Sequence, residues 1–93
     1  MRTYEAMCVF HADTDAFTRG KDAVRSELTK LDAKILKEED MGQRTLSYPI
    51  KKETQGHYFY FVAEMEPEKA QQAPKAVELL EDLLRFMVVR QES

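Results

Sequence analysis

A chain of 93 residues, 43% hydrophobic and 33% charged, is long enough to bury one core and too short for two domains, so we expect a single domain over residues 1–93. The net charge of -3 argues against a protein that binds nucleic acid through bulk positive charge. The single cysteine, Cys8, excludes an internal disulfide and a CxxC metal site, which favours the cytosol. No apolar run approaches the roughly 20 residues that span a bilayer, so no membrane is expected as a partner.

The first predicted element is a strand over residues 3–10, where apolar side chains alternate. One face of this strand would carry Tyr4, Ala6, Cys8 and Phe10. The other face would carry Glu5, Met7 and Val9, and its two apolar members indicate that it is not fully solvated.

A helix is predicted next, because Asp13 to Asp15 supply candidates for its N-cap. Gly20 lowers helix propensity by about 1 kcal/mol relative to alanine, so this helix must depend on packing. Its apolar stripe consists of Phe17, Val24, Leu28 and Leu31.

A long second strand is predicted over residues 35–50, where Gly42 marks a bulge or a close approach. Pro49 lacks an N–H group and therefore belongs on an edge strand or near a strand end. Residues 51–56, KKETQG, predict a turn that Gly56 closes, and a third strand follows it.

The second predicted helix opens at Pro67 and Glu68, because proline is favoured in a first turn. Pro74 would impose a kink or a later start of this helix. The inner stripe would consist of Ala70, Ala73, Val77 and Leu80. A fourth strand over residues 84–90 closes the chain.

The predicted order is therefore βαββαβ, and the economical fold for it is α+β. Two helices would pack on one face of a four-stranded antiparallel sheet, in the ferredoxin-like split βαβ arrangement. Right-handed crossovers would place the first and third strands at the centre and leave the second and fourth as edges. The sheet face away from the helices would then be open.

The third strand, residues 57–65, carries bulky side chains on both faces, whereas a sheet with one wet face should alternate. One interpretation is a wholly buried central strand with some tyrosine hydroxyls in water. The other is an exposed apolar patch that marks an interface. Its members would be Met7, Val9, Tyr58, Tyr60, Val62, Met87 and Val89.

Cations gather at the strand ends and at the hairpin tip. They are Arg2, Arg44, Lys51, Lys52, Arg85 and Arg90. Cations at these places can simply protect sheet edges from aggregation, and for an isolated lysine we favour that interpretation. Arginine binds phosphate in bidentate geometry and stacks on bases, so the four arginines are the stronger candidates for a binding role.

An enzymatic interpretation has little support in the residues. Cys8 lies inside a strand pattern and is expected to fill the core. His11 has no acid or base partner nearby in sequence, and His57 is expected to be a solvated histidine of the hairpin. The two histidines are not spaced as metal ligands, and no glycine-rich phosphate loop is present, so neither a metal nor a cofactor is expected.

Several short motifs, in order along nearly the whole chain, resemble those of bacterial small-subunit (30S) ribosomal protein six. They are Met1-Arg2-x-Tyr4-Glu5, Gly42-x-Arg44-x-Leu46-x-Tyr48-Pro49-Ile50, Gln55-Gly56-x-Tyr58, Glu64-Met65 and Leu84-Arg85-x-Met87-Val88-Val89. Each motif is weak alone, but their joint order and spacing are specific.

The resemblance implies the split βαβ fold and a structural, non-enzymatic role in the small ribosomal subunit, in the cytoplasm. It implies binding to 16S ribosomal RNA in the central domain (platform) as a heterodimer with small-subunit ribosomal protein eighteen, after ribosomal protein fifteen has organised the junction. It implies no cofactor and no small-molecule substrate. A modest net charge is tolerable if the partner supplies much of the phosphate contact.

The resemblance also implies two sets of site residues. The RNA-binding set is Arg2, Tyr4, Arg85, Met87 and Arg90. The partner-protein set is Arg44, Leu46, Tyr48, Pro49, Ile50 and Tyr60.

Two other classes of function fit the predicted fold, because this fold hosts many functions. A regulatory or enzymatic domain would need a ligand-binding glycine-rich turn, and an acylphosphatase-like enzyme would need an anion-cradling loop with arginine and asparagine. The chain contains no asparagine. A homodimeric module that uses its open sheet face remains an alternative.

Overall fold

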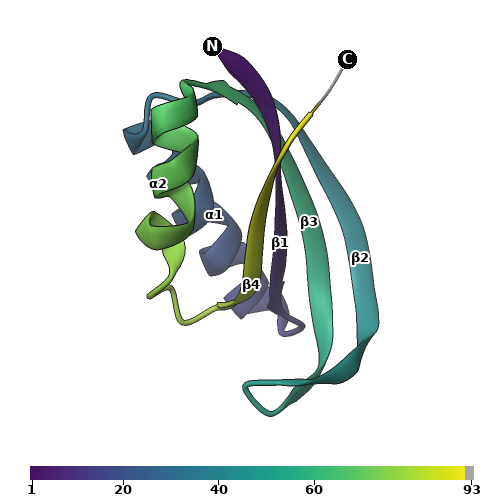
Figure 1. Cartoon of the computed structure of the whole chain (residues 1–93). Helices are drawn as coiled ribbons and strands as arrows, with labels where there is room; N and C mark the ends of the chain where they lie inside the picture. Colours follow the sequence, from purple (N-terminus) through teal and green to yellow (C-terminus); the bar gives the residue numbers. More distant parts are fainter. Residues whose placement is uncertain (92–93) are drawn as a thin grey trace.

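The computed structural model describes residues 1–91 and contains the predicted order of elements (Figure 1). The elements are β1 (Arg2–His11), α1 (Thr14–Lys30), β2 (Lys34–Ile50), β3 (Glu53–Met65), α2 (Pro67–Val77) and β4 (Leu83–Arg90). The expected βαββαβ pattern is confirmed. The last two residues of the predicted domain, 92 and 93, lie outside the described part.

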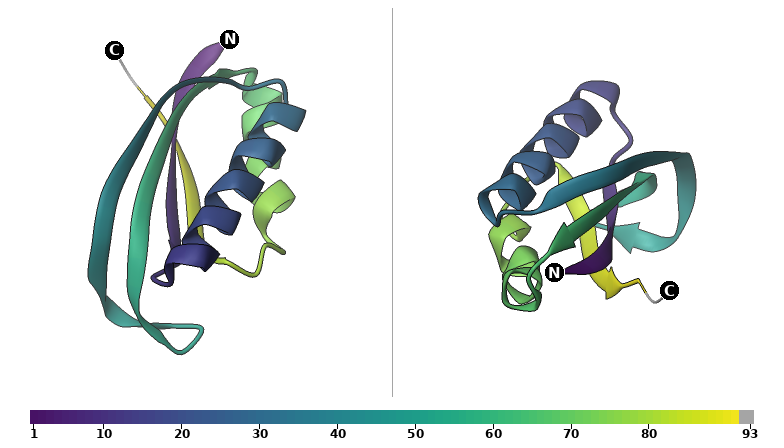
Figure 2. Two further views of the ribbon diagram at one scale, coloured as in Figure 1. Left: turned by 180° about the vertical axis from the view of Figure 1, so that it is seen from behind. Right: turned by 90° about the horizontal axis from the view of Figure 1, so that it is seen from above.

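The four strands form one antiparallel sheet in the order β2-β3-β1-β4. Strands β1 and β3 are therefore central and β2 and β4 are the edges, as predicted. Both helices lie against one face of the sheet, which curves around them (Figure 2). This is the ferredoxin-like α+β fold.

The core lies between the helices and the sheet. On β1 the predicted face of Tyr4, Ala6, Cys8 and Phe10 is buried. On β3 the helix-facing residues are Phe59, Phe61, Ala63 and Met65, and they are buried too. Full burial of one large apolar side chain stabilises a fold by about 1.5–3 kcal/mol, so this layer is the main source of stability.

Helix α1 begins where its cap was predicted, since Asp13 Oδ2 accepts a hydrogen bond from Ala16 N at 3.0 Å. Gly20 lies on the buried side of this helix. A Cβ at this position would lie 2.6 Å from Phe10 Cδ1, so glycine is needed where the helix crosses β1. Glycine lowers the helix propensity of α1, but its missing side chain is what allows the close contact between the helix and Phe10.

Helix α2 contains Pro74 in its interior, so the expected later start is wrong. The helix begins at Pro67, as proposed for its first turn. Proline removes one hydrogen-bond donor in the last part of an 11-residue helix, while Ala70, Ala73 and Val77 remain buried on the inner face. Packing of that stripe supports the helix through the proline.

The hairpin between β2 and β3 differs from the prediction. Its turn consists only of Lys51 and Lys52, with φ of 50° and 69°, and β3 already begins at Glu53. Ile50 pairs with Glu53, so this is a two-residue hairpin in which both turn residues are left-handed. The predicted six-residue turn was wrong because Gly56 does not close the turn; it lies within β3, where it packs closely against Val9.

Gly56 allows the hairpin to cross the end of β1. A Cβ on Gly56 would lie 2.5 Å from Val9 Cγ1 and 3.4 Å from Leu46 Cδ2. Val9 points away from the helices, yet it is only 1% exposed. The hairpin therefore covers one end of the face that was predicted to be open.

The curl of the hairpin is visible at the lower end of the sheet, where the turn lies below β4 (Figure 1). The predicted bulge at Gly42 is confirmed by a shift in the β2–β3 register between Asp40 and Gly42 and by a φ of 81°. Lys51 Nζ donates a hydrogen bond to Leu83 O at 3.1 Å, so the turn contacts the start of β4. On the sheet face away from the helices, only the part beyond Val9, away from the hairpin, remains uncovered.

Candidate functional site

The uncovered part of the sheet carries an apolar stripe across three strands. Met7 pairs with Tyr60 on one side and with Met87 on the other. Val89 lies further up β4, and Met87 and Val89 are 47% and 50% exposed. An exposed apolar patch across neighbouring strands is a feature of interaction surfaces. The prediction of an exposed patch is confirmed at Met87 and Val89 and wrong at Val9, which the hairpin buries. The other predicted members are half-buried, namely Met7, Tyr58, Tyr60 and Val62.

A shallow hollow of about 440 Å³ lies beside this stripe, between β2 and β3. It is lined by Met41, Arg44, Thr45, Tyr58 and Tyr60. Two residues of the predicted partner set, Arg44 and Tyr60, therefore come together on the open face. The bulge at Gly42 lies within the part of β2 that lines the hollow, between Met41 and Arg44.

Tyr48 and Arg85 are in direct contact, although they belong to different predicted sets. Arg85 Nη2 donates a hydrogen bond to the Tyr48 hydroxyl, and Arg85 Cζ lies 5.6 Å from the centroid of the Tyr48 ring. Tyr48 is on β2 and Arg85 is on β4, the two opposite edges of the sheet. The curled hairpin thus brings the predicted partner-facing segment onto a predicted RNA-binding residue.

The predicted RNA-binding set is divided between the two faces of the sheet. Arg85 and Met87 lie on the open face, opposite Val9 and Met7 of β1. Tyr4 and Arg90 pair with each other on the helix side, beside α2. Arg2 precedes Tyr4 on the same side of β1, at the exposed end of the strand.

Tyr4 is largely buried, with 8% of its surface exposed. Strand alternation explains this burial, because Tyr4 shares its face with Ala6 and Cys8. The exposed part of Tyr4 lines a groove of about 460 Å³ between α2 and β4. This groove is lined by Tyr4, Pro67, Ala70, Gln71, Pro74, Val88 and Arg90.

The predicted partner set follows the lower part of β2. β2 pairs with β3 as far as Thr45 and pairs with it again at Ile50, so residues 46–49 form an irregular stretch of the strand. Leu46 reaches back toward Gly56, whereas Tyr48 is 54% exposed. Pro49 lies in this edge strand, as predicted from its missing N–H group.

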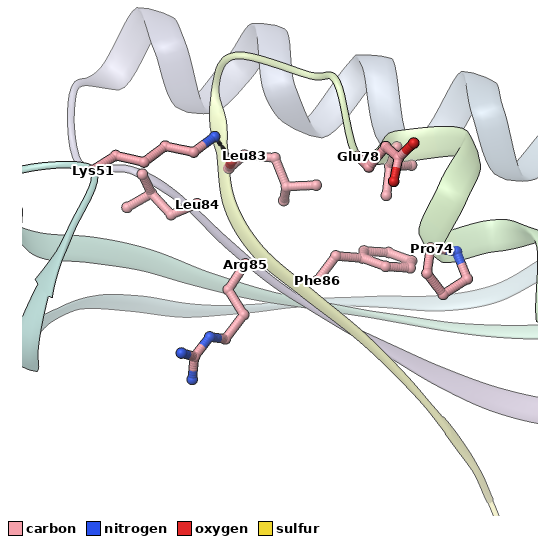
Figure 3. A pocket seen from close by; sticks show the side chains of 8 residues that line it. Lys51, Pro74, Glu78, Leu83, Leu84, Arg85 and Phe86 are labelled. Carbon is pink, nitrogen blue, oxygen red and sulfur yellow. Dashed lines mark hydrogen bonds between the residues drawn. The ribbon is translucent and has the colours of Figure 1, made fainter.

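A second groove, of about 240 Å³, lies between α2 and the start of β4 (Figure 3). Pro74 and Phe86 form part of its wall, and Lys51 reaches its edge through the hydrogen bond to Leu83 O. The Arg85 guanidinium points away from Phe86 and Pro74. Arg85 therefore borders this groove, while its guanidinium is directed toward Tyr48 on the open face.

The two histidines are structural residues whose partners lie far away in sequence. His11 Nδ1 is 2.6 Å from Glu53 Oε1, and His11 Nε2 is 3.1 Å from Glu81 O, so the ring joins the hairpin to the α2–β4 loop. His57 stacks on Phe17 and is 15% exposed, so the expectation of a solvated histidine was wrong. Sequence spacing held no signal for these contacts, because the strand register creates them.

The carboxylates on β2 are paired with groups on the helix side. Glu38 bonds to Arg25 of α1 with distances of 2.6 and 2.8 Å, and the guanidinium lowers the pKa of Glu38. Asp40 Oδ1 accepts hydrogen bonds from His57 Nε2 at 2.6 Å and from Gly42 N at 2.8 Å. These two donors lower the pKa of Asp40, with His57 the larger cause. Two carboxylates of this exposed part of β2 are thus tied to the rest of the domain.

Cys8 is completely buried, which confirms its interpretation as a core residue. Burial raises the pKa of its thiol. Within residues 1–91, no cluster of three His, Cys, Asp or Glu side chains is arranged to hold a metal ion. No helix in the same part of the chain is both long and apolar enough to cross a membrane.

Two helices on one face of an antiparallel sheet, with exposed apolar and cationic side chains on the other, define a protein of the ferredoxin-like α+β class. Residues 3–90 match the family model described as Ribosomal protein S6. The chain therefore belongs to the ribosomal protein S6 family, whose members are structural, non-enzymatic constituents of the small ribosomal subunit. As such it is a cytoplasmic, ribosome-associated protein.

Curated relatives and a solved structure agree with this assignment. The chain is 43% identical to small ribosomal subunit protein bS6 of Treponema pallidum over 93 residues, which cover 100% of both chains. It is 39% identical to the protein of the same name from Treponema denticola, over 99% of each chain. The crystal structure of 30S ribosomal protein S6 from Thermotoga maritima superposes with a TM-score of 0.85 at 22% identity, covering 97% of this chain and 87% of that one. This structural match supports the fold.

Proposed function

We propose that the chain binds 16S ribosomal RNA in the central domain of the small subunit, as a heterodimer with small-subunit ribosomal protein eighteen. In this proposal the heterodimer joins RNA on which ribosomal protein fifteen has already organised the junction, and it assists subunit assembly and translation. Membership of the S6 family carries the proposal. We further propose that residues 1–93 act as one domain.

The open sheet face is the surface that we assign to the partner protein. It combines the apolar side chains of Met7 and Tyr60 with the hollow that contains Arg44. An apolar centre with a polar rim is typical of protein interfaces. The exposed part of the hairpin at Tyr48 and Pro49 continues this surface toward the sheet edge.

The arginines at the ends of β1 and β4 are the residues that we assign to RNA. Arg2 and Arg90 lie near the same end of the sheet, and Arg85 lies further along β4. Arginine suits this role because its guanidinium donates several hydrogen bonds to phosphate oxygens. The net charge of -3 predicts that the isolated chain binds RNA weakly and that the heterodimer binds tightly.

The test is reconstitution on a central-domain fragment of 16S RNA that already carries protein fifteen. RNA affinity and chemical protection are measured for this chain alone, for protein eighteen alone and for the mixture. We expect a stable heterodimer, weak binding by this chain alone and strong protection of the RNA by the pair. A mixture that forms no heterodimer and leaves the RNA unprotected would overturn the proposal.

A double substitution that removes two arginines tests the placement of the RNA surface. Arg2→Ala combined with Arg85→Ala should weaken RNA binding by the pair and reduce the slope of log K against log salt by about 2, roughly one for each phosphate contact. The matched control is Lys30→Ala with Lys75→Ala, which removes two exposed cations from the helices. Equal slopes for the two double variants would reject this placement of the RNA surface.

A further inference from the structure

The contact between Tyr48 and Arg85 joins the two edges of the sheet across the open face. These residues are 37 positions apart, and the β2–β3 hairpin brings them together by curling over the end of β1. One end of the contact lies in the segment that we assign to the partner protein. The other end is an arginine that we assign to RNA.

The hairpin that carries Tyr48 is anchored to the sheet independently of Arg85. Lys51 Nζ donates to Leu83 O at 3.1 Å, at the start of the strand that carries Arg85. His11 Nδ1 holds Glu53 Oε1 at 2.6 Å on the other side of the turn. Leu46 packs toward Gly56 and Val9, beneath the hairpin. Tyr48 is therefore held in place over the sheet by contacts that do not involve Arg85.

The hydrogen bond to Tyr48 restricts the Arg85 side chain and still leaves it able to bind a ligand. A guanidinium has five N–H donors, and the Tyr48 hydroxyl accepts from Nη2 alone. The other donors remain free to bind phosphate oxygens. Holding a long side chain in its binding geometry reduces the entropy that it would otherwise lose when the ligand arrives. Tyr48 thus orients Arg85 without occupying its binding capacity.

We propose that Tyr48 is a positioning residue that holds the Arg85 guanidinium in place for a ribosomal RNA phosphate, and that it couples partner binding on the hairpin to RNA binding at β4. This inference rests on the function proposed above. A partner that packs on the hairpin stabilises the position of Tyr48, which favours the binding geometry of Arg85. Because coupling between two binding sites is reciprocal, bound RNA also favours the partner.

The test is a double-variant cycle with Tyr48→Phe and Arg85→Ala, measured as RNA affinity of the heterodimer. Tyr48→Phe keeps the ring and removes only the hydroxyl that accepts from Arg85. It should weaken RNA binding by about 3- to 10-fold, the size of one typical net hydrogen bond, because Tyr48 acts on the RNA only through Arg85. In the Arg85→Ala background the same change should have no further effect. The matched control is Ser26→Ala, which removes an exposed hydroxyl from α1, outside both proposed surfaces, and should change the affinity by less than about twofold.

Two outcomes overturn this inference while the proposed function stands. One is a Tyr48→Phe heterodimer whose RNA affinity equals that of the unmodified pair. The other is an equal loss of affinity with and without Arg85, which would mean that Tyr48 contacts RNA directly. A pair that binds no RNA would instead overturn the proposed function, and the inference with it.

A measurement without RNA tests the positioning itself. In the free protein labelled with ¹⁵N, the side-chain Nε–Hε signal of Arg85 should show a high order parameter, which Tyr48→Phe lowers and Ser26→Ala does not. Addition of protein eighteen should raise the order of Arg85 in the unmodified chain and fail to do so in Tyr48→Phe. Equal mobility of Arg85 in the unmodified chain and in Tyr48→Phe would overturn the inference.

Discussion

The imidazole of His57 lies flat on the ring of Phe17, with the ring centroids 3.6 Å apart and the planes inclined by 5°. His57 is on β3 and Phe17 is on α1, so this stack joins the first helix to the sheet. The same imidazole bonds to Asp40 Oδ1, whose carboxylate also accepts from Gly42 N in the β2 bulge. One histidine therefore links a helix, a central strand and the bend of the edge strand.

The pairing of Asp40 predicts that stability depends on pH in the acid range. Its pKa is lowered in the folded chain by His57 and by Gly42 N, so the carboxylate stabilises the fold above the unfolded-state pKa of about 3.9. This stabilisation is lost as pH falls through the lower folded pKa. Asp40→Asn should therefore reduce the free energy of unfolding by about 0.5 kcal/mol at pH 7, because the pair is partly exposed, and by less at pH 3. Urea unfolding at the two pH values measures the difference.

The control for this prediction is Glu39→Gln on the same strand. Glu39 pairs with Tyr60 on the open face, and its ion pair with Lys37 is long, at 3.9 Å. Its replacement should change stability little at either pH. A deficit for Asp40→Asn that is equally large at pH 3 would show that the Asp40 charge does not produce the effect.

Replacing Gly20 by alanine should improve helix propensity and worsen core packing, and we expect the packing effect to be the larger one. Alanine at this position of α1 would gain about 1 kcal/mol of helix propensity. Its Cβ would lie 2.6 Å from Phe10 Cδ1 and 3.1 Å from Asp82 Cβ, and Phe10 is completely buried. Overpacking a core costs about 1–3 kcal/mol, so we expect Gly20→Ala to lower the free energy of unfolding, measured in urea.

The exposed position Ser26 on the same helix provides the comparison for Gly20. Ser26→Ala should raise stability by about 0.5 kcal/mol, because only propensity changes there. If Gly20→Ala also stabilises the protein, the ring of Phe10 moves easily, and glycine is not required for the crossing.

The two-residue turn predicts that one lysine can be replaced with a gain in stability. Lys52 has a φ of 69°, a left-handed conformation that costs a residue with a Cβ about 1 kcal/mol. Lys52→Gly should raise the free energy of unfolding by about that amount and leave the Lys51 hydrogen bond to Leu83 O intact. Lys52→Ala removes the same charge and keeps the Cβ, so thermal unfolding of the two variants separates charge from backbone strain. Equal midpoints would contradict this explanation.

The burial of Cys8 predicts that its thiol does not react in the folded chain. Its surface is 0% exposed, and burial raises its pKa, so little reactive thiolate exists at pH 8. A chromogenic disulfide reagent should label the protein only after denaturation or at the rate at which the core opens. Labelling within seconds in buffer would contradict the packing of β1 under the helices.

Features of the fold that depend on neighbouring residues were predicted well from the sequence. The alternation at Ala6 and Cys8, the cap at Asp13 and the central position of β1 and β3 were all predicted correctly. These features depend on residues that are close in sequence or on general rules of chain connection. The predicted turn failed because Gly56 has the composition of a turn residue but is needed for contact with Val9.

The candidate site shows the same division between local pattern and long-range contact. The cations, the exposed apolar residues and the family motifs were visible in the sequence. Their arrangement was not, since the buried Tyr4, the covered Val9 and the contact between Tyr48 and Arg85 depend on strand register and hairpin curl.

The order of the elements, the buried faces and the family followed from the amino-acid sequence alone, because hydrophobic period, capping residues and ordered motifs act over a few positions. The partners of the two histidines, the extent of the open face and the junction of the hairpin with β4 were decided only in the folded molecule. These contacts join residues between 17 and 70 positions apart, such as His57 with Asp40 and His11 with Glu81. Sheet register and curvature bring such residues together, and neither quantity is encoded in a short stretch of chain.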